Sequence, residues 1–144
     1  MPAFAYPARI EEAAPGEFIV TFRDVPEAVT GAATLVEAAD LAMDALSVAI
    51  EGYLEADRPI PVASPVEAGD VAVPLSLAVA ARVALQDAMA AGGVSRRALG
   101  QRLGKDEKHV RRILAGEASL DQSVAAMRVL GLQPQLAVVQ LEAA

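Results

Sequence analysis

The segment GVSRRALGQRLGKDEKHVRRILAGE, residues 93–117, carries two short helix patterns separated by a glycine. Ser95 is a favourable N-cap for a helix that closes at Gly104, and Asp106 can cap a second helix that stops at Gly116. Two helices joined by a turn of about three residues that contains glycine have the dimensions of a helix-turn-helix. The segment therefore predicts this motif in the second half of the chain.

The apolar positions agree with two helices packed on each other. Gly100 has no side chain, so it would let the second helix approach the first closely. The side chains predicted to face inward together are Leu99, Leu103, Val110 and Ile113. The residues left on the outward face of the second helix are basic.

The same segment is cationic, although the chain of 144 residues carries a net charge of −7. Between Ser95 and Arg112, seven Lys and Arg residues stand against two acidic residues, which gives a local charge of +5. A recognition helix presents such cations to DNA phosphates and base edges. A basic helix face that is only solvated is the alternative. Ser95 is among the residues expected at DNA. The others are Arg96, Arg97, Arg102 and Lys105, towards the phosphates, and Lys108, His109, Arg111 and Arg112, nearest the bases.

Charge is distributed unevenly along the chain. Residues 1–72 carry three basic and 13 acidic residues, a net charge of −10, whereas residues 73–144 carry nine and six, a net charge of +3. A chain of this length can form one ordinary domain or two small ones, and the asymmetry favours two. We therefore expect an acidic N-terminal domain and a basic C-terminal domain, in a small protein of the kind that often dimerises.

The first half begins with the pattern of a small antiparallel sheet. FAYPARI (residues 4–10) and EFIVTF (residues 17–22) alternate apolar and polar residues on either side of Pro15-Gly16, a strong turn signal. They predict a hairpin, and a third strand is expected around Val29. A proline-rich segment, residues 58–70, predicts an edge strand followed by a linker.

One long helix is expected between these strands. Thr34 and Glu37 have the spacing of a capping box, which predicts a helix over residues 35–56. Its inward stripe is expected to consist of Leu35, Ala39, Ala42, Leu46, Ala49 and Tyr53. The predicted fold class is thus α+β, with the sheet and long helix first and a helical bundle second.

Two further helices and a strand complete the predicted second half. A helix over residues 77–91 ends at paired glycines, and Ser119 with Gln122 opens another helix that ends at Gly131. A strand is expected over residues 134–142. It would pair with the same strand of a second copy across a two-fold axis, or fold back onto its own N-terminal domain.

The composition excludes several classes of site. The chain has no cysteine and a single histidine, so thiolate metal sites and histidine clusters are excluded. Residues 71–81, the longest stretch without charge near the helix over 77–91, are far fewer than the roughly 20 that a membrane span needs, and a cytoplasmic protein without membrane or cofactor is expected. Asp24, Glu37, Asp40 and Asp44 could collect a divalent metal, but a capping residue and a solvated helix face explain them as well.

With both halves considered, the chain resembles the HicB antitoxins of bacterial HicA–HicB toxin–antitoxin pairs. The first half follows that family's order of hairpin, F-x-D-x-P turn, T-x-G-x-T-x-x-E-A helix start and closing I-P, in YPARIEEAAPGEFIVTFRDVPEAVTGAATLVEAADLAMDALSVAIEGYLEADRPIP. The second half is similar to the version of the family with a helix-turn-helix, through LGQRLGKDEKHVRRIL and SLDQSVAAMRVLG.

The resemblance implies a partial ribonuclease-H-like fold without nuclease activity. Residues 1–62 would bind a small, basic, mRNA-cleaving HicA-type toxin, residues 63–75 would be a linker, and residues 76–144 would bind operator DNA as a homodimer or tetramer. A ligand-responsive repressor without a toxin partner, or a divalent-metal nuclease, is the alternative. The residues expected to contact the toxin are Asp24, Glu27 and Glu37.

Overall fold

The computed structural model of the protein describes residues 4–140. The chain divides into two compact units between Val83 and Ala84, and each is described by itself. The first unit contains β1 (Ala5–Ala14), β2 (Glu17–Phe22), β3 (Val29–Ala32), α1 (Leu35–Glu55) and β4 (Val71–Pro74). The second contains most of α2 (Leu77–Gly92), then α3 (Arg96–Leu103), α4 (Glu107–Leu114) and α5 (Leu120–Val129). The predicted α+β class is confirmed.

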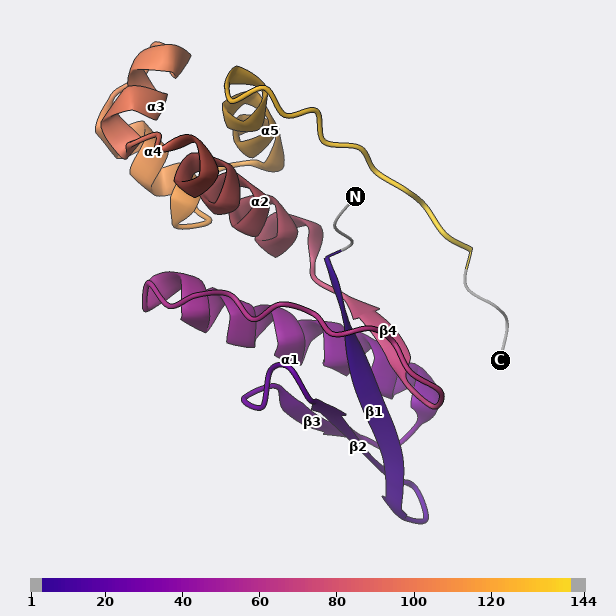
Figure 1. The fold of residues 1–144 in the computed structure, drawn as a ribbon. Coiled ribbons are helices and arrows are strands. Elements are labelled where there is room, and N and C mark those ends of the chain that lie inside the picture. The colour runs from indigo at the N-terminus through magenta and orange to yellow at the C-terminus, as the bar shows by residue number, and fades with distance from the viewer. Residues whose placement is uncertain (1–3, 141–144) are drawn as a thin grey trace. The chain divides into compact units, whose positions relative to one another are not determined.

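The first unit is a four-stranded antiparallel sheet in the order β3-β2-β1-β4, with α1 packed along one face (Figure 1). The predicted hairpin is β1–β2, in which Ile10 pairs with Val20, and the predicted third strand is β3. Side chains alternate between the faces of a strand, so one face of the hairpin can be apolar throughout. That face forms the core with α1 through Tyr6, Ala8, Val20, Phe22, Leu46 and Ile50.

The first turn of α1 is capped almost as predicted. The Thr34 hydroxyl accepts a hydrogen bond from the backbone N–H of Glu37 at 3.1 Å. The Glu37 carboxylate accepts from the backbone N–H of Ala33, also at 3.1 Å, rather than from Thr34. The predicted inward stripe is wrong at its start, because Leu35 and Ala39 are exposed. The residues of α1 buried in the core are Ala38, Ala42, Leu46, Ser47, Ile50, Tyr53 and Leu54.

The edge strand predicted within residues 58–70 is wrong, because this segment forms no strand and β4 is the edge strand instead. Proline lacks the N–H group that a strand ladder needs, and prolines recur along the segment. Polar side chains attach it to the sheet. Asp24 accepts hydrogen bonds from the backbone N–H and the hydroxyl of Ser64, both at 2.9 Å, and Tyr6 donates to the Pro61 carbonyl at 2.6 Å.

A buried carboxylate anchors the end of the same segment. The side chain of Asp70 is fully buried and lies 2.9 Å from Arg9 Nε and 2.8 Å from an Arg23 guanidinium nitrogen. It also accepts from the Glu67 backbone N–H, and this bond, with the two guanidinium groups, holds the pKa of Asp70 below its ordinary value. β4 begins at the next residue, inside the span expected to be a linker.

The first turns of α2 pack against α1 within the first unit. Val79 and Val83 are buried in that unit's core, and the Ser76 backbone N–H donates to the Ser47 hydroxyl at 3.0 Å. Arg82 is buried, with a guanidinium nitrogen 3.8 Å from the Glu51 carboxylate. The assignment of functions to residues 1–62 and 76–144 stays a prediction.

The predicted helix ends of the second unit are confirmed. Ser95, Asp106 and Ser119 accept N-cap hydrogen bonds at the starts of α3, α4 and α5, and Ser119 with Gln122 forms the full capping box. Gly104 ends α3 in the left-handed region at a φ of +67°, which a residue with a side chain rarely adopts.

The described residues of the strand predicted over 134–142 do not form a strand. Residues 132–140 have no regular secondary structure, and residues 141 and 142 lie outside the described part. A strand requires hydrogen-bond partners, and the described sheet of this chain supplies none to the segment. Leu136, Val138 and Val139 are exposed there. Pairing with a second copy stays a prediction.

Candidate functional site

α3 and α4 are two eight-residue helices joined by Gly104, Lys105 and Asp106. Their contact is apolar, with Leu99, Val110 and Ile113 buried as predicted and Leu103 half-buried. The close approach predicted at Gly100 is present, but it is made by the turn residues Lys105 and Asp106 rather than by the second helix itself. A Cβ atom at Gly100 would lie 2.9 Å from the Lys105 carbonyl oxygen, closer than real Cβ contacts allow. The Lys105 backbone N–H donates to the Gly100 carbonyl at 2.8 Å, so the turn is packed directly on α3.

The cationic side chains of this segment all lie at the surface. The exposed ones are Arg96, Arg97, Arg102, Lys105, Lys108, Arg111 and Arg112, while His109 is half-buried. None of the seven forms an ion pair with another residue in the described range. Their charge is therefore available to an anionic partner. Ser95 is exposed, and its hydroxyl accepts from the Ala98 backbone N–H at 3.0 Å.

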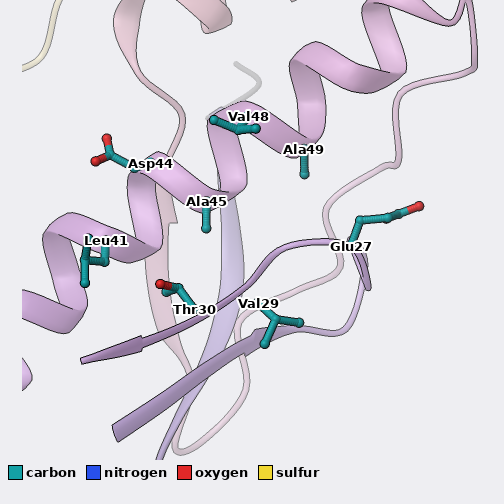
Figure 2. Close-up of a pocket in the computed structure, with 8 residues that line it drawn as sticks. All are labelled: Glu27, Val29, Thr30, Leu41, Asp44, Ala45, Val48 and Ala49. Atoms are coloured by element: carbon teal, nitrogen blue, oxygen red, sulfur yellow. The ribbon is translucent and has the colours of Figure 1, made fainter. Parts of the chain in front are cut away.

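The first unit has a groove of about 500 Å³ between α1 and β3, which we call the α1–β3 groove. Figure 2 shows the side chains of Leu41, Ala45 and Ala49 pointing from α1 towards β3, where Thr30 points back. The carboxylates of Asp44 and Glu27 lie towards opposite ends of this row. The complete lining is Glu27, Val29, Thr30, Leu41, Asp44, Ala45, Val48 and Ala49.

Glu27 is the acidic group of the groove that the fold positions most firmly. The Tyr53 hydroxyl donates to the Glu27 carboxylate at 2.8 Å, and an Arg58 guanidinium nitrogen lies 3.7 Å away. The Tyr53 hydrogen bond is the main cause that lowers the pKa of Glu27, with the charge of Arg58 adding to it. Half of the Glu27 side chain remains exposed, so an ionised carboxylate faces solvent.

The three residues predicted to contact a toxin have different structural surroundings. Glu27 lines the groove, whereas Asp24 is bound to Ser64 and Glu37 caps the first turn of α1. Sequence reasoning missed the apolar lining on α1. No sequence signal marks Val48, because its 68% exposure becomes known only from the fold.

The geometric condition for a metal site is not met in the described residues. No group of three or more His, Asp or Glu side chains between residues 4 and 140 is arranged to hold a metal ion. Within the same range, no single helix has the length and apolar composition of a membrane span. Only α2 and α3 taken together pass that test, and they are bent by 104°.

The fold and surfaces define a protein of two units, an acidic α+β unit and a helical unit whose cationic side chains form no ion pairs with other described residues. The family model described as HicB_like antitoxin of bacterial toxin-antitoxin system matches residues 5–84. The chain is 32% identical over 136 residues to Antitoxin HicB of Escherichia coli (strain K12), which covers 93% of this chain and 99% of that protein. It is 38% identical over 108 residues to Antitoxin HicB 1 of Photorhabdus laumondii, in an alignment that covers 75% of this chain and 68% of that protein.

A second Photorhabdus laumondii protein, Antitoxin HicB 2, is 33% identical over 136 residues, covering 93% of this chain and 96% of that protein. The chain belongs to the HicB-like antitoxin family of bacterial toxin–antitoxin systems. The predicted family is confirmed.

Proposed function

We propose that this protein neutralises a HicA-type mRNA-cleaving toxin through its first unit and represses its own operon through its second unit. It acts by binding, without catalysing a reaction, and does so as a homodimer in the cytoplasm. The observation that carries the proposal is the separation of charge. Residues 1–83 contain four basic and 13 acidic residues, a net charge of −9, and residues 84–144 contain eight and six, a net charge of +2.

The anionic first unit suits a cationic toxin. Complementary fields raise the rate of encounter and reject partners of the wrong sign. A small ribonuclease that binds RNA must itself be cationic on the face that meets its substrate. An acidic partner that covers this face blocks the substrate without needing any catalytic group of its own.

The cationic second unit suits operator DNA. α3 and α4 have the lengths and the three-residue turn of a helix-turn-helix, in which the second helix enters the major groove. Exposed Lys108, Arg111 and Arg112 on α4 would then be closest to base edges, and the cations of α3 and the turn to phosphates.

A homodimer would give the two recognition helices the spacing of a palindromic operator. The exposed apolar side chains of residues 132–140 support association, because pairing with a second copy would bury them and satisfy their backbone groups. Sedimentation of the full chain should therefore report a dimer, or a tetramer of two dimers.

The toxin half is tested by co-expression. The reading frame adjacent to this gene is expected to encode a short basic protein that contains a histidine. Its expression alone should arrest growth, and co-expression of this chain should restore growth and yield a complex that co-purifies. Growth arrest that persists with soluble antitoxin present would contradict the toxin half.

The operator half is tested with the DNA upstream of the same operon. The full chain should protect a palindromic site in this upstream DNA from cleavage by an added nuclease. It should also reduce transcription from the operon's promoter. Competition with unrelated DNA of equal length separates specific binding from phosphate attraction. Equal affinity for both DNAs would contradict operator recognition.

A ligand-responsive repressor is the second candidate. The α1–β3 groove, at about 500 Å³, has a volume within the range of small-molecule sites, but its exposed walls disfavour this candidate. This alternative predicts DNA binding that a small metabolite changes and that no protein partner alters. Co-purification of a toxin would decide against it.

A further inference from the structure

We propose that the α1–β3 groove is the docking site for the toxin, which places apolar side chains between α1 and β3 and Lys or Arg side chains against Glu27 and Asp44. This inference rests on the proposed function, and it names the surface and the partner chemistry. Among the residues predicted from sequence to contact the toxin, it keeps Glu27 and removes Asp24 and Glu37 from the centre of the interface.

The apolar part of the groove is open to water. Val29 on β3 is 57% exposed and Val48 on α1 is 68% exposed, and half-buried Leu41 and Ala45 lie between the helix and the strand. Sites for small ligands enclose most of the ligand surface. A groove whose own walls are exposed cannot do so, but it can form the centre of a flat protein interface.

The charges of the groove select a cationic occupant. Glu27 is held ionised by Tyr53 and remains half exposed. Asp44 is exposed and forms no ion pair with any other described residue. The unit around them carries a net charge of −9, so an anionic partner would be repelled and a basic one attracted.

The strand at the groove adds a second means of attachment. β3 is at the end of the described sheet, where β2 is its only strand neighbour. The outer edge of such a strand presents backbone N–H and C=O groups to a partner. A partner that enters the groove can therefore satisfy backbone groups of β3 while its side chains reach α1.

The test uses the full chain and a catalytically inactive form of the protein encoded by the adjacent reading frame. Val48→Arg places a cation and a bulky side chain in the groove. Val36→Arg is the matched control, because Val36 is on the same helix with 69% exposure and does not line the groove. We expect Val48→Arg to weaken binding at least about tenfold, as the loss of an interface centre does, and Val36→Arg to stay within about threefold.

A charge pair of variants completes the test. Asp44→Lys should weaken binding at least about tenfold. Glu11→Lys makes the same change in net charge on β1, where Glu11 pairs with Ile19 on the sheet face away from α1, and should have a much smaller effect. Thermal unfolding of every variant confirms folding, since all four positions are exposed.

The outcomes separate the two proposals. Binding by the unchanged chain together with equal binding by Val48→Arg and Asp44→Lys would overturn the groove and leave the antitoxin function standing. Equal losses in Asp44→Lys and Glu11→Lys would reduce the role of the groove to general charge attraction and would also overturn the proposal. No binding by the unchanged chain would overturn both.

Discussion

Gly100 controls how closely the turn after α3 packs on that helix. Alanine at this position would place its Cβ atom 2.9 Å from the Lys105 carbonyl oxygen, and both groups are held by backbone geometry. We expect Gly100→Ala to lower the free energy of unfolding by about 1–3 kcal/mol, the usual cost of overpacking. Urea unfolding of the variant and the unchanged chain measures this difference in free energy.

Gly52 supplies the control for that prediction. It also lies within a helix, but a Cβ atom there would meet nothing within 4 Å. Gly52→Ala should raise the free energy of unfolding by about 0.5–1 kcal/mol, because alanine loses less backbone freedom on folding. If Gly100→Ala is stabilising to the same degree, the close approach of the turn is not what the structure indicates.

Asp70 makes the first unit sensitive to acid. Its pKa is lowered in the folded chain, so its stabilisation is present above the ordinary pKa of 3.8 and is lost as the pH falls through the folded value. Asp70→Asn should therefore reduce the free energy of unfolding at neutral pH, and the difference from the unchanged chain should shrink below about pH 4. Urea unfolding at several pH values measures this difference.

Glu55→Gln is the control for acid sensitivity, because Glu55 is exposed at the end of α1. Its effect on unfolding should stay within about 0.5 kcal/mol. A difference between Asp70→Asn and the unchanged chain that is constant from neutral to acid pH would show that the charge of Asp70 is not responsible for the effect.

At the scale of elements, the sequence predicted the helix caps and the hairpin, because each depends on residues close together in the chain. The caps at Ser95, Asp106 and Ser119 were predictable because each one depends on residues at most three positions apart. The hairpin was predictable for the same reason, since Pro15-Gly16 and the alternating residues beside it suffice. Contacts between residues far apart in the chain could not be predicted from such local patterns.

β4 and the α1–β3 groove illustrate what the sequence could not provide. β4 has four residues, and it pairs with β1 residues that precede it by more than 60 positions, so no local pattern marks it. Pro7 of β1 pairs with Ala72 of β4. It lies before Ala8, where pairing of β1 with β2 begins, so Pro7 has no partner residue on β2. Val48 could not be recognised as a groove residue until β3 was placed beside α1.

The cap of α4 connects local chemistry to stability of the second unit. The Asp106 carboxylate accepts from the His109 backbone N–H at 2.8 Å. Asp106→Ala should lower the free energy of unfolding by about 1 kcal/mol, and Asp106→Asn should retain most of it, because asparagine is an equally good N-cap. Urea unfolding of both variants checks the prediction. Equal losses in the two would indicate that the charge, and not the cap, stabilises α4.

At the scale of the whole molecule, two units of opposite net charge suit the two proposed partners, a cationic toxin and anionic DNA. The negative charge of the first unit would repel DNA, so the proposed operator binding requires an excess of cations concentrated on the second unit. In the described range, α3, α4 and the turn between them carry this excess without neutralising ion pairs. Screening by salt should therefore act on DNA binding through this segment.

Arg111→Ala and Arg112→Ala test whether α4, which is proposed to lie nearest the base edges, also contacts phosphates. Each lost phosphate contact should flatten the plot of log affinity for DNA against log salt concentration by about 0.9. Arg58→Ala removes the same charge from the first unit, where Arg58 is exposed beside Glu27, and should leave the slope unchanged. Fluorescence anisotropy with operator DNA at several salt concentrations measures all three slopes. If Arg58→Ala flattens the slope as much as the α4 variants do, net charge governs DNA binding and the cations of α4 have no special place at the interface.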